Sequence, residues 1–232
     1  MIYATADLHG YSIEKFKKLL KKANFSDDDF LFVLGDVIDR GEDGVEILRW
    51  LMEQPNVELI LGNHEAMMLA CAFLFDEITD KSIENISVEG LKSLELWRRN
   101  GGDVTINALS KTKASVRSEI FEYLHDCPLY DTVSIGDKNY LLVHGGLGNY
   151  QKGKKIREYT PSDLLWARVY PSVRYSDAFT TVLGHTPTCT YGGEYAGKIY
   201  KADTWINIDV GAACGYAPAL LRLDDMKEFY GD

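Results

Sequence analysis

Four of the five histidines of this chain lie in short motifs rich in aspartate, asparagine and glycine. Histidine is the commonest metal ligand in proteins, and carboxylate and amide groups add oxygen ligands. One such motif alone is common in ordinary turns, but five that each follow an apolar segment predict a site for two divalent metal ions. In chain order they are Asp7-Leu8-His9-Gly10, Gly35-Asp36-Val37-Ile38-Asp39-Arg40-Gly41, Gly62-Asn63-His64-Glu65, Val143-His144-Gly145-Gly146 and Gly184-His185-Thr186.

The segments that precede the first three motifs are predicted to be strands. Residues 2–6, 29–34 and 57–61 are short and apolar, as in strands buried on both faces. Amphipathic patterns at 12–23 and 44–54 predict helices between them. Such an alternation favours parallel strands with right-handed crossovers, and active sites gather beyond the carboxyl ends of parallel strands. The first three motifs should therefore meet at one edge of a sheet.

The rest of the chain is predicted to be helical first and then rich in strands. Helical patterns run from Glu65 to about Leu124, with a break at 100–102, and His125 falls at a helix end. Strands are expected at 131–135, 140–143, 180–184, 205–210 and 219–223, and a mobile loop at 148–159. We therefore expect residues 1–232 to form a single α/β domain with two mixed sheets flanked by helices.

Composition limits the function classes. The net charge of -10 and the pI near 5.0 argue against nucleic acid and anionic membranes as partners, because both attract basic surfaces. The sequence shows no signal peptide and no apolar run of the roughly 18 residues that span a bilayer. The four cysteines form no C-x-x-C pair, so we expect buried, reduced thiols and a cytoplasmic protein.

The residue types in the motifs suggest how the metal ligands divide between two ions. Asp7 and His9 are two residues apart and could reach one ion, and Asp36 is placed to bridge the two ions. The expected ligands of the second ion are Asn63, His144 and His185. Nitrogen and oxygen ligands together suit manganese, iron or zinc better than calcium.

Three further side chains predict phosphate chemistry. Arg40 and Arg168 can each present a planar guanidinium to two phosphate oxygens, although Arg40 alone could also form a surface salt bridge. His64 could act as a general acid with Asp39 holding its second ring nitrogen, or could instead be a further metal ligand. Two ions and two arginines would make the site locally cationic within an acidic protein.

At these residues the chain resembles the calcineurin-like metallophosphoesterases. It is most similar to the phosphoprotein phosphatase branch, which includes bacterial and bacteriophage lambda serine/threonine protein phosphatases. The likeness also covers Asn100-Gly101-Gly102, Pro128-Leu129-Tyr130, Trp166-Ala167-Arg168, Pro187 and Ile208-Asp209-Val210-Gly211-Ala212.

The resemblance implies a four-layer αββα fold, in which a central mixed β-sandwich is flanked by helices. It also implies two divalent ions, with manganese favoured, and a metal-bridging hydroxide that attacks a phosphomonoester in line. Asp7, His9 and Asp36 would hold the first ion, and Asp36, Asn63, His144 and His185 the second. Arg40 and Arg168 would bind phosphate, while His64, paired with Asp39, would protonate the leaving group. The implied activity is that of a serine/threonine protein phosphatase.

Two residues depart from the family pattern, and one of them keeps a second activity open. Ala6 replaces a usual glycine, and its small side chain should still fit. Leu61 stands where phosphoprotein phosphatases typically have arginine, and leucine there resembles the symmetrical dinucleoside tetraphosphate hydrolases. Those relatives, however, usually end the third motif in aspartate rather than Glu65, and they lack the Asp39-Arg40-Gly41 sequence.

The predicted partner is a phosphorylated protein or a small phosphoester. Because the long carboxyl-terminal extension of eukaryotic members is absent, no regulatory subunit is expected to dock. A nuclease would need a basic face for the nucleic-acid backbone, which this acidic chain lacks. A metal-binding scaffold without turnover would have lost a ligand, an arginine or the acid, and here every position is filled.

Overall fold

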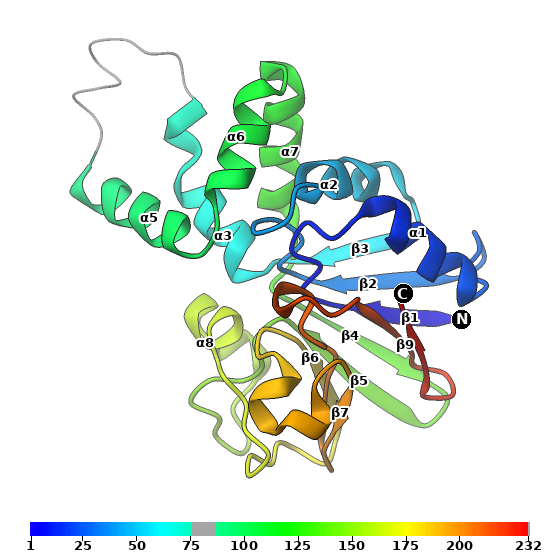
Figure 1. Ribbon diagram of the computed structural model, residues 1–232. Coiled ribbons are helices and arrows are strands. Elements are labelled where there is room, and N and C mark those ends of the chain that lie inside the picture. Colours follow the sequence, from blue (N-terminus) through cyan, green and yellow to red (C-terminus); the bar gives the residue numbers. More distant parts are fainter. Residues whose placement is uncertain (76–86, 232) are drawn as a thin grey trace.

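Two five-stranded mixed sheets lie at the centre of the computed structural model, which describes residues 1–75 and 87–231 (Figure 1). The first sheet has the order β10-β9-β1-β2-β3, and the second has the order β4-β5-β6-β8-β7. The first contains β1 (Ile2–Thr5), β2 (Phe30–Leu34), β3 (Val57–Ile60), β9 (Ala219–Arg222) and β10 (Lys227–Tyr230). The second contains β4 (Tyr130–Ile135), β5 (Lys138–Val143), β6 (Thr180–Leu183), β7 (Tyr200–Lys201) and β8 (Trp205–Asn207).

Parallel pairing in both sheets brings the motifs to the same end of the molecule. β1 pairs with β2 and β2 with β3 in parallel, while β9 and β10 add an antiparallel edge. In the second sheet β5, β6 and β8 are parallel, and β4 and β7 are antiparallel edge strands. The expected strand-helix-strand series is confirmed, and the carboxyl ends of β1, β2 and β3 lie together as predicted.

Alternate residues of the strands face two different apolar cores. Tyr3, Leu31 and Val33 face the helices that cover the first sheet. Their neighbours Ala4 and Phe32 face the second sheet, where they pack with residues such as Tyr140, Val182 and Ile206. Because both faces are buried, the strands need the continuous apolar runs seen in the sequence.

The helices lie outside the sheets: α1 and α2 cover the first sheet, and α6 and α7 pack beside α2 (Figure 1). Leu164 of α8 instead packs in the core outside the second sheet, together with Tyr159 and Tyr175. The expected fold of two mixed sheets flanked by helices is confirmed, although α8 is only 5 residues long. The helices are α1 (Ile13–Lys22), α2 (Gly44–Glu53), α3 (Asn63–Ala70), α5 (Val88–Arg99), α6 (Asp103–Lys111), α7 (Ala114–Asp126) and α8 (Pro161–Leu165).

Several finer expectations are tested by these elements. The helix predicted at 12–23 is α1, which Ser12 caps, and His125 lies in the last turn of α7 as predicted. The predicted helical segment is helical in α3, α5, α6 and α7, while its part at 76–86 lies outside the described residues. Loop 148–159 contains a 3-10 helix at Ile156–Glu158 and buries Tyr159. Among the described residues, no helix is both long and apolar enough to cross a membrane.

The expectation of four buried thiols was wrong in part. All four cysteines are reduced, but only Cys71 is buried. Cys127 and Cys189 are partly exposed, and Cys214 is exposed. The last two lie in 3-10 turns outside the sheets, where short apolar segments do not reach the core. The presence of a cysteine therefore did not predict a buried position in this chain.

Candidate metal centre

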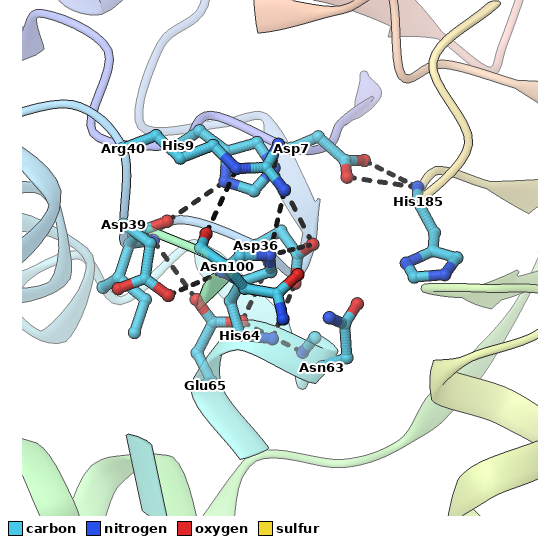
Figure 2. A network of polar contacts seen from close by, with 12 residues as sticks. Asp7, His9, Asp36, Asp39, Arg40, Asn63, His64, Glu65, Asn100 and His185 are labelled. Carbon is cyan, nitrogen blue, oxygen red and sulfur yellow. Dashed lines mark hydrogen bonds and ion pairs between the residues drawn. The ribbon is translucent and has the colours of Figure 1, made fainter. Parts of the chain in front are cut away.

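All predicted site residues except Arg168 lie just beyond the ends of five strands, and most of them are labelled in Figure 2. Asp7 and His9 follow β1, the second motif follows β2, and Asn63 and His64 begin α3 directly after β3. His144 and His185 follow β5 and β6 of the second sheet. The carboxylates, imidazoles and the Asn63 amide are all buried, whereas both arginines are exposed.

Backbone conformation sets the site apart from the rest of the described chain. Within the described chain as a whole, nine residues other than glycine have a positive φ, and six of these nine are predicted site residues. Their φ values lie between 43° and 71°. Such conformations cost free energy and cluster at functional sites, where the surrounding structure enforces them. The six are Asp7, His9, Asp36, Asp39, Arg40 and His185.

Two glycines permit close approaches at the site. Gly101 has a φ of 97°, and a methyl group there would lie 2.8 Å from Cγ of Arg40. Its carbonyl accepts a hydrogen bond from the backbone N–H of Arg40 at 3.2 Å, so the 100–102 turn holds this arginine in place. A methyl group at Gly184 would collide with the carboxylate of Asp7. Both positions therefore require glycine.

Three other ligand atoms lie close to Nε2 of His144. This nitrogen lies 2.9 Å from Oδ1 of Asn63, 3.2 Å from Nδ1 of His185 and 3.4 Å from Oδ1 of Asp36. Ligand atoms bound at right angles to one ion at about 2.1 Å would lie roughly 3 Å apart. The observed separations therefore match a shared cation, and they unite all four residues predicted for the second ion.

The protonation of this group also fits a cation. Nδ1 of His144 lies 2.7 Å from the carbonyl oxygen of Leu34, to which it donates, so Nε2 faces the other ligand atoms. Burial lowers the pKa of His144, but the charge of Asp36 outweighs burial and raises this pKa to about 10. In the absence of a metal ion, a proton on His144 supplies the positive charge that the neighbouring ligand atoms of Asp36, Asn63 and His185 attract. Burial lowers the pKa of His185 to about 3, which keeps its imidazole neutral and able to bind a metal.

A second group contains His9, Asp36 and His64, whose ligand atoms lie within 4.8 Å of one another. Nε2 of His9 and Nε2 of His64 each lie 3.8 Å from Oδ2 of Asp36. Burial lowers the pKa of His9 to about 3, so its ring is neutral. Since Asp36 belongs to both groups, it occupies the position expected of a bridging ligand.

Asp7 lies differently from the expectation. Its two carboxylate oxygens accept hydrogen bonds from the backbone N–H of His185 at 3.1 and 2.9 Å (Figure 2). Among the described residues it does not join His9 and Asp36 in a three-residue group. Burial and the nearby charge of Asp209 raise the pKa of Asp7 well above its usual value. The structure thus brings Asp7 to the site but turns it toward the β6 loop.

His64 is held by Asp39, as the sequence predicted. Nδ1 of His64 lies 2.6 Å from Oδ2 of Asp39. Burial lowers the pKa of His64, but Asp36 and then Asp39 outweigh it, so this pKa is raised. The Nε2 side of the ring faces the pocket and lies 3.4 Å from Nη2 of Arg40. The ring is therefore oriented as a proton donor would be, and its raised pKa favours the protonated form.

Two residues that the sequence analysis missed fix Asp39. Trp97 Nε1 donates to Oδ2 at 2.8 Å, and the hydroxyl of Thr105 donates to Oδ1 at 2.6 Å. Thr105 also accepts the backbone N–H of Asp39 at 3.0 Å. Trp97 belongs to α5 and Thr105 to α6, so the helical segment after β3 positions the His64 partner. The only sequence signal was a tryptophan at helical spacing, which is typical of an ordinary core.

Glu65 is another residue whose role was missed. It is fully buried and accepts hydrogen bonds from the backbone N–H groups of Asp36 and Val37, both at 2.8 Å. It also accepts from Ile38 at 3.3 Å and from Gly62 at 3.1 Å. The carboxylate therefore joins the loop after β2 to the loop after β3. Its place three residues after Gly62, at the N3 position of α3, was the available signal.

A pocket of about 170 Å³ opens above the two groups. His9, Asp36, Asn63, His64, His185 and both arginines line it. Nη1 of Arg40 lies 3.3 Å from Nε2 of His9, and Arg168 reaches the same pocket from the loop after α8. Asp209, also in the lining, has a pKa that burial raises to about 7. The pocket can therefore offer two guanidinium groups to an anion held over the metal ligands.

Two adjacent groups of metal ligands, with arginines above them and strand ends below, define a metal-dependent phosphoesterase. The family model described as calcineurin-like phosphoesterase matches residues 1–207, and the chain belongs to this family. Members use a dimetal centre, which agrees with the two groups found here.

Relatives in sequence carry two different names. Serine/threonine-protein phosphatase 2 of Salmonella typhimurium is 29% identical over 227 residues, which cover 92% of this chain and 88% of the relative. A symmetrical bis(5'-nucleosyl)-tetraphosphatase of Buchnera aphidicola is 35% identical over 94 residues, or 40% of this chain. The chain spans only 33% of the length of that second relative.

Solved structures with the same fold also differ in name. One described as a candidate diadenosine tetraphosphatase has a TM-score of 0.65 and 17% identity. The alignment covers 99% of this chain and 92% of that protein. A cold-active protein tyrosine phosphatase has a TM-score of 0.57 and 18% identity, with coverage of 95% and 72%. At these identities the likeness shows the fold alone.

Proposed function

We propose that this protein is a dimetal-dependent phosphomonoesterase that acts on phosphorylated serine or threonine in proteins. The observation that carries the proposal is the pair of ligand groups that share Asp36 beneath Arg40 and Arg168. When bound, two divalent ions, with manganese favoured and iron or zinc as alternatives, supply a nucleophilic water of lowered pKa and balance the charge of the phosphate. The ligands would be Asp7, His9 and Asp36 for one ion, and Asp36, Asn63, His144 and His185 for the other.

The arginines and His64 supply the remaining chemistry. Arg40 and Arg168 bind the non-bridging phosphate oxygens and orient the ester in the pocket. His64 holds a proton on Nε2 and passes it to the leaving oxygen, while Asp39 fixes the ring through Nδ1. The local positive charge acts at short range, since charges beyond a Debye length of roughly 8 Å are screened. The net charge of -10 elsewhere therefore does not keep phosphate out.

Two observations favour a phosphoprotein substrate. The phosphatase relative is similar along 92% of this chain and 88% of its own length, whereas the tetraphosphatase match covers only 40% of this chain. Leu61, the residue that favoured the dinucleotide alternative, is buried and absent from the pocket lining. Its side chain therefore does not contact the bound phosphoester, and the leucine is a weak guide to the substrate.

Hydrolysis of dinucleoside polyphosphates is the second candidate, because several relatives that match 37–40% of this chain carry that activity in their names. Manganese-reconstituted protein would be given a phosphoserine peptide and diadenosine tetraphosphate side by side, with a chelator control. The proposal expects faster, chelator-sensitive phosphate release from the peptide. Preferential hydrolysis of the dinucleotide would replace it with the second candidate.

A further inference from the structure

Three neighbouring hollows, which share lining residues in sequence, lead away from the metal centre. The pocket above the metal ligands shares Trp166 and Arg168 with a hollow of about 440 Å³. That hollow shares Leu147 and Tyr150 with a third, of about 600 Å³, which is partly lined by loop 148–159. We call the second and third hollows together the side groove. A substrate held by Arg168 would therefore continue into the side groove.

Aromatic side chains line the side groove at its two junctions. Trp166 is 37% exposed, and its indole packs edge-on against His185 with ring centroids 6.1 Å apart. Tyr150 is half-buried and packs edge-on against Tyr175, with centroids 5.1 Å apart. Aromatic rings that are braced in this way but still accessible provide contact area at a low cost in conformational entropy. They suit an extended chain that passes from one hollow to the next.

The far end of the side groove carries positive charge in an acidic protein. Lys154 lies over the ring of Tyr159, 3.9 Å from its centroid, and 3.8 Å from a carboxylate oxygen of Asp163. Lys155 lines the third hollow, is exposed, and has no ion pair within the described part of the chain. Its charge is therefore available to a ligand. Loop 148–159 contains one acidic residue and four basic ones, namely Glu158, Lys152, Lys154, Lys155 and Arg157.

We propose that the side groove binds the polypeptide that flanks the phosphorylated residue, and that Lys155 selects acidic side chains there. This inference rests on the proposed function. An extended polypeptide advances about 3.3 Å per residue, so successive side chains can occupy successive hollows. The exposed ammonium group attracts carboxylates through a charge interaction at the rim, which affects substrate capture and weakens with salt.

Two phosphoserine peptides test the selection. The acidic peptide has glutamate residues on both sides of the phosphoserine. The neutral peptide is identical except that glutamine replaces each of these glutamates. The wild-type protein is expected to favour the acidic peptide in kcat/KM by about three- to fivefold at low salt, the size of one exposed ion pair. Lys155→Glu should remove or reverse this preference through KM. Lys111→Glu, the same charge change at the end of α6, should keep it and leave p-nitrophenyl phosphate hydrolysis unchanged.

The outcomes separate the inference from the proposed function. If wild-type protein hydrolyses both peptides equally, or if Lys155→Glu keeps the preference, the side groove does not select acidic sequences, while the phosphatase activity stands. Hydrolysis of diadenosine tetraphosphate with neither peptide cleaved would overturn both proposals. Tyr150→Ala provides a second test, because it should raise KM for both peptides by removing a contact shared by two hollows. An unchanged KM would contradict peptide binding there.

Discussion

The indole Nε1 of Trp97 donates a 2.8 Å hydrogen bond to Oδ2 of Asp39, 58 residues earlier in the chain. The same oxygen lies 2.6 Å from Nδ1 of His64. A helix that contributes no metal ligand thus sets the position of the carboxylate that orients the proposed acid. Supporting hydrogen bonds of this kind typically change activity by about 10- to 100-fold when they are removed.

Trp97→Phe tests this support. The substitution keeps an aromatic ring in the core but removes the N–H donor, so Asp39 should hold His64 less firmly. We expect kcat for alkyl phosphates to fall by about 10- to 100-fold. Trp50→Phe, a matched change at a tryptophan that packs against Phe16, should have little effect on kcat. Similar losses in the two variants would show that Trp97 serves stability alone.

His64→Asn tests the general acid. A poor leaving group such as an alkoxide needs the proton, whereas nitrophenolate leaves readily without it. We expect turnover of alkyl phosphates to fall by about 10²- to 10⁴-fold, with a far smaller loss for p-nitrophenyl phosphate. Steady-state kinetics on the two substrates would check this. Equal losses on both would assign His64 to metal binding, the alternative that its place beside His9 and Asp36 allows.

Glu65→Gln tests the hydrogen bonds by which Glu65 connects the loop after β2 to the loop after β3. Oε2 of Glu65 accepts from the backbone N–H groups of Asp36 and Gly62, and Oε1 accepts from Val37 and Ile38. An amide has only one acceptor oxygen, so two buried donors would face an NH₂ group. We expect the free energy of unfolding to fall by about 2–4 kcal/mol. Denaturant unfolding would measure it, and an unchanged midpoint would refute this role.

Asp7→Asn tests whether Asp7 is a metal ligand despite its hydrogen bonds to His185. The amide oxygen can still accept the backbone N–H, but the negative charge is lost. If Asp7 contributes to the first ion, bound manganese should fall from about two ions per chain toward one. Elemental analysis of reconstituted protein would show this. Two tightly bound ions in the variant would make Asp7 a residue that only positions the β6 loop.

Metal removal should destabilise the fold as well as abolish turnover. Asp36 and His144 are buried, and without ions the positive charge they need comes from a proton. A ligand that binds only the folded state at about 100 times its dissociation constant stabilises it by about 2.7 kcal/mol. A chelator should therefore lower the melting temperature of the wild-type protein. In the His144→Ala variant, the chelator should lower the melting temperature by less than in the wild-type protein. A decrease of equal size would show that the ions bind elsewhere.

The sequence alone located the strands and the convergence of ligands because the two are linked. Each ligand motif follows an apolar run that forms a buried strand. The same run therefore predicted both the strand and the end of the strand at which the ligands lie. His144 and His185 could be joined to Asp36 for the same reason, although they come from a different sheet.

The supporting residues could not be predicted in this way. Trp97 and Thr105 lie in helices, where an aromatic or small polar residue at helical spacing is usually part of the core. Their hydrogen bonds to Asp39 depend on how α5 and α6 pack, which no local pattern specifies. The orientation of Asp7 toward His185 depends likewise on contact between the two sheets. β7 was missed because it has only 2 residues, and β10 because it begins with Lys227 and Glu228 and so shows no apolar run.

The most direct test of the central claim is a manganese titration of metal-free protein, followed by phosphate release from p-nitrophenyl phosphate. The account predicts that activity rises until about two ions are bound per chain and then saturates, and that Asp36→Asn prevents this rise. Full activity in excess chelator, or saturation at a single ion, would contradict a centre in which Asp36 joins two metal sites.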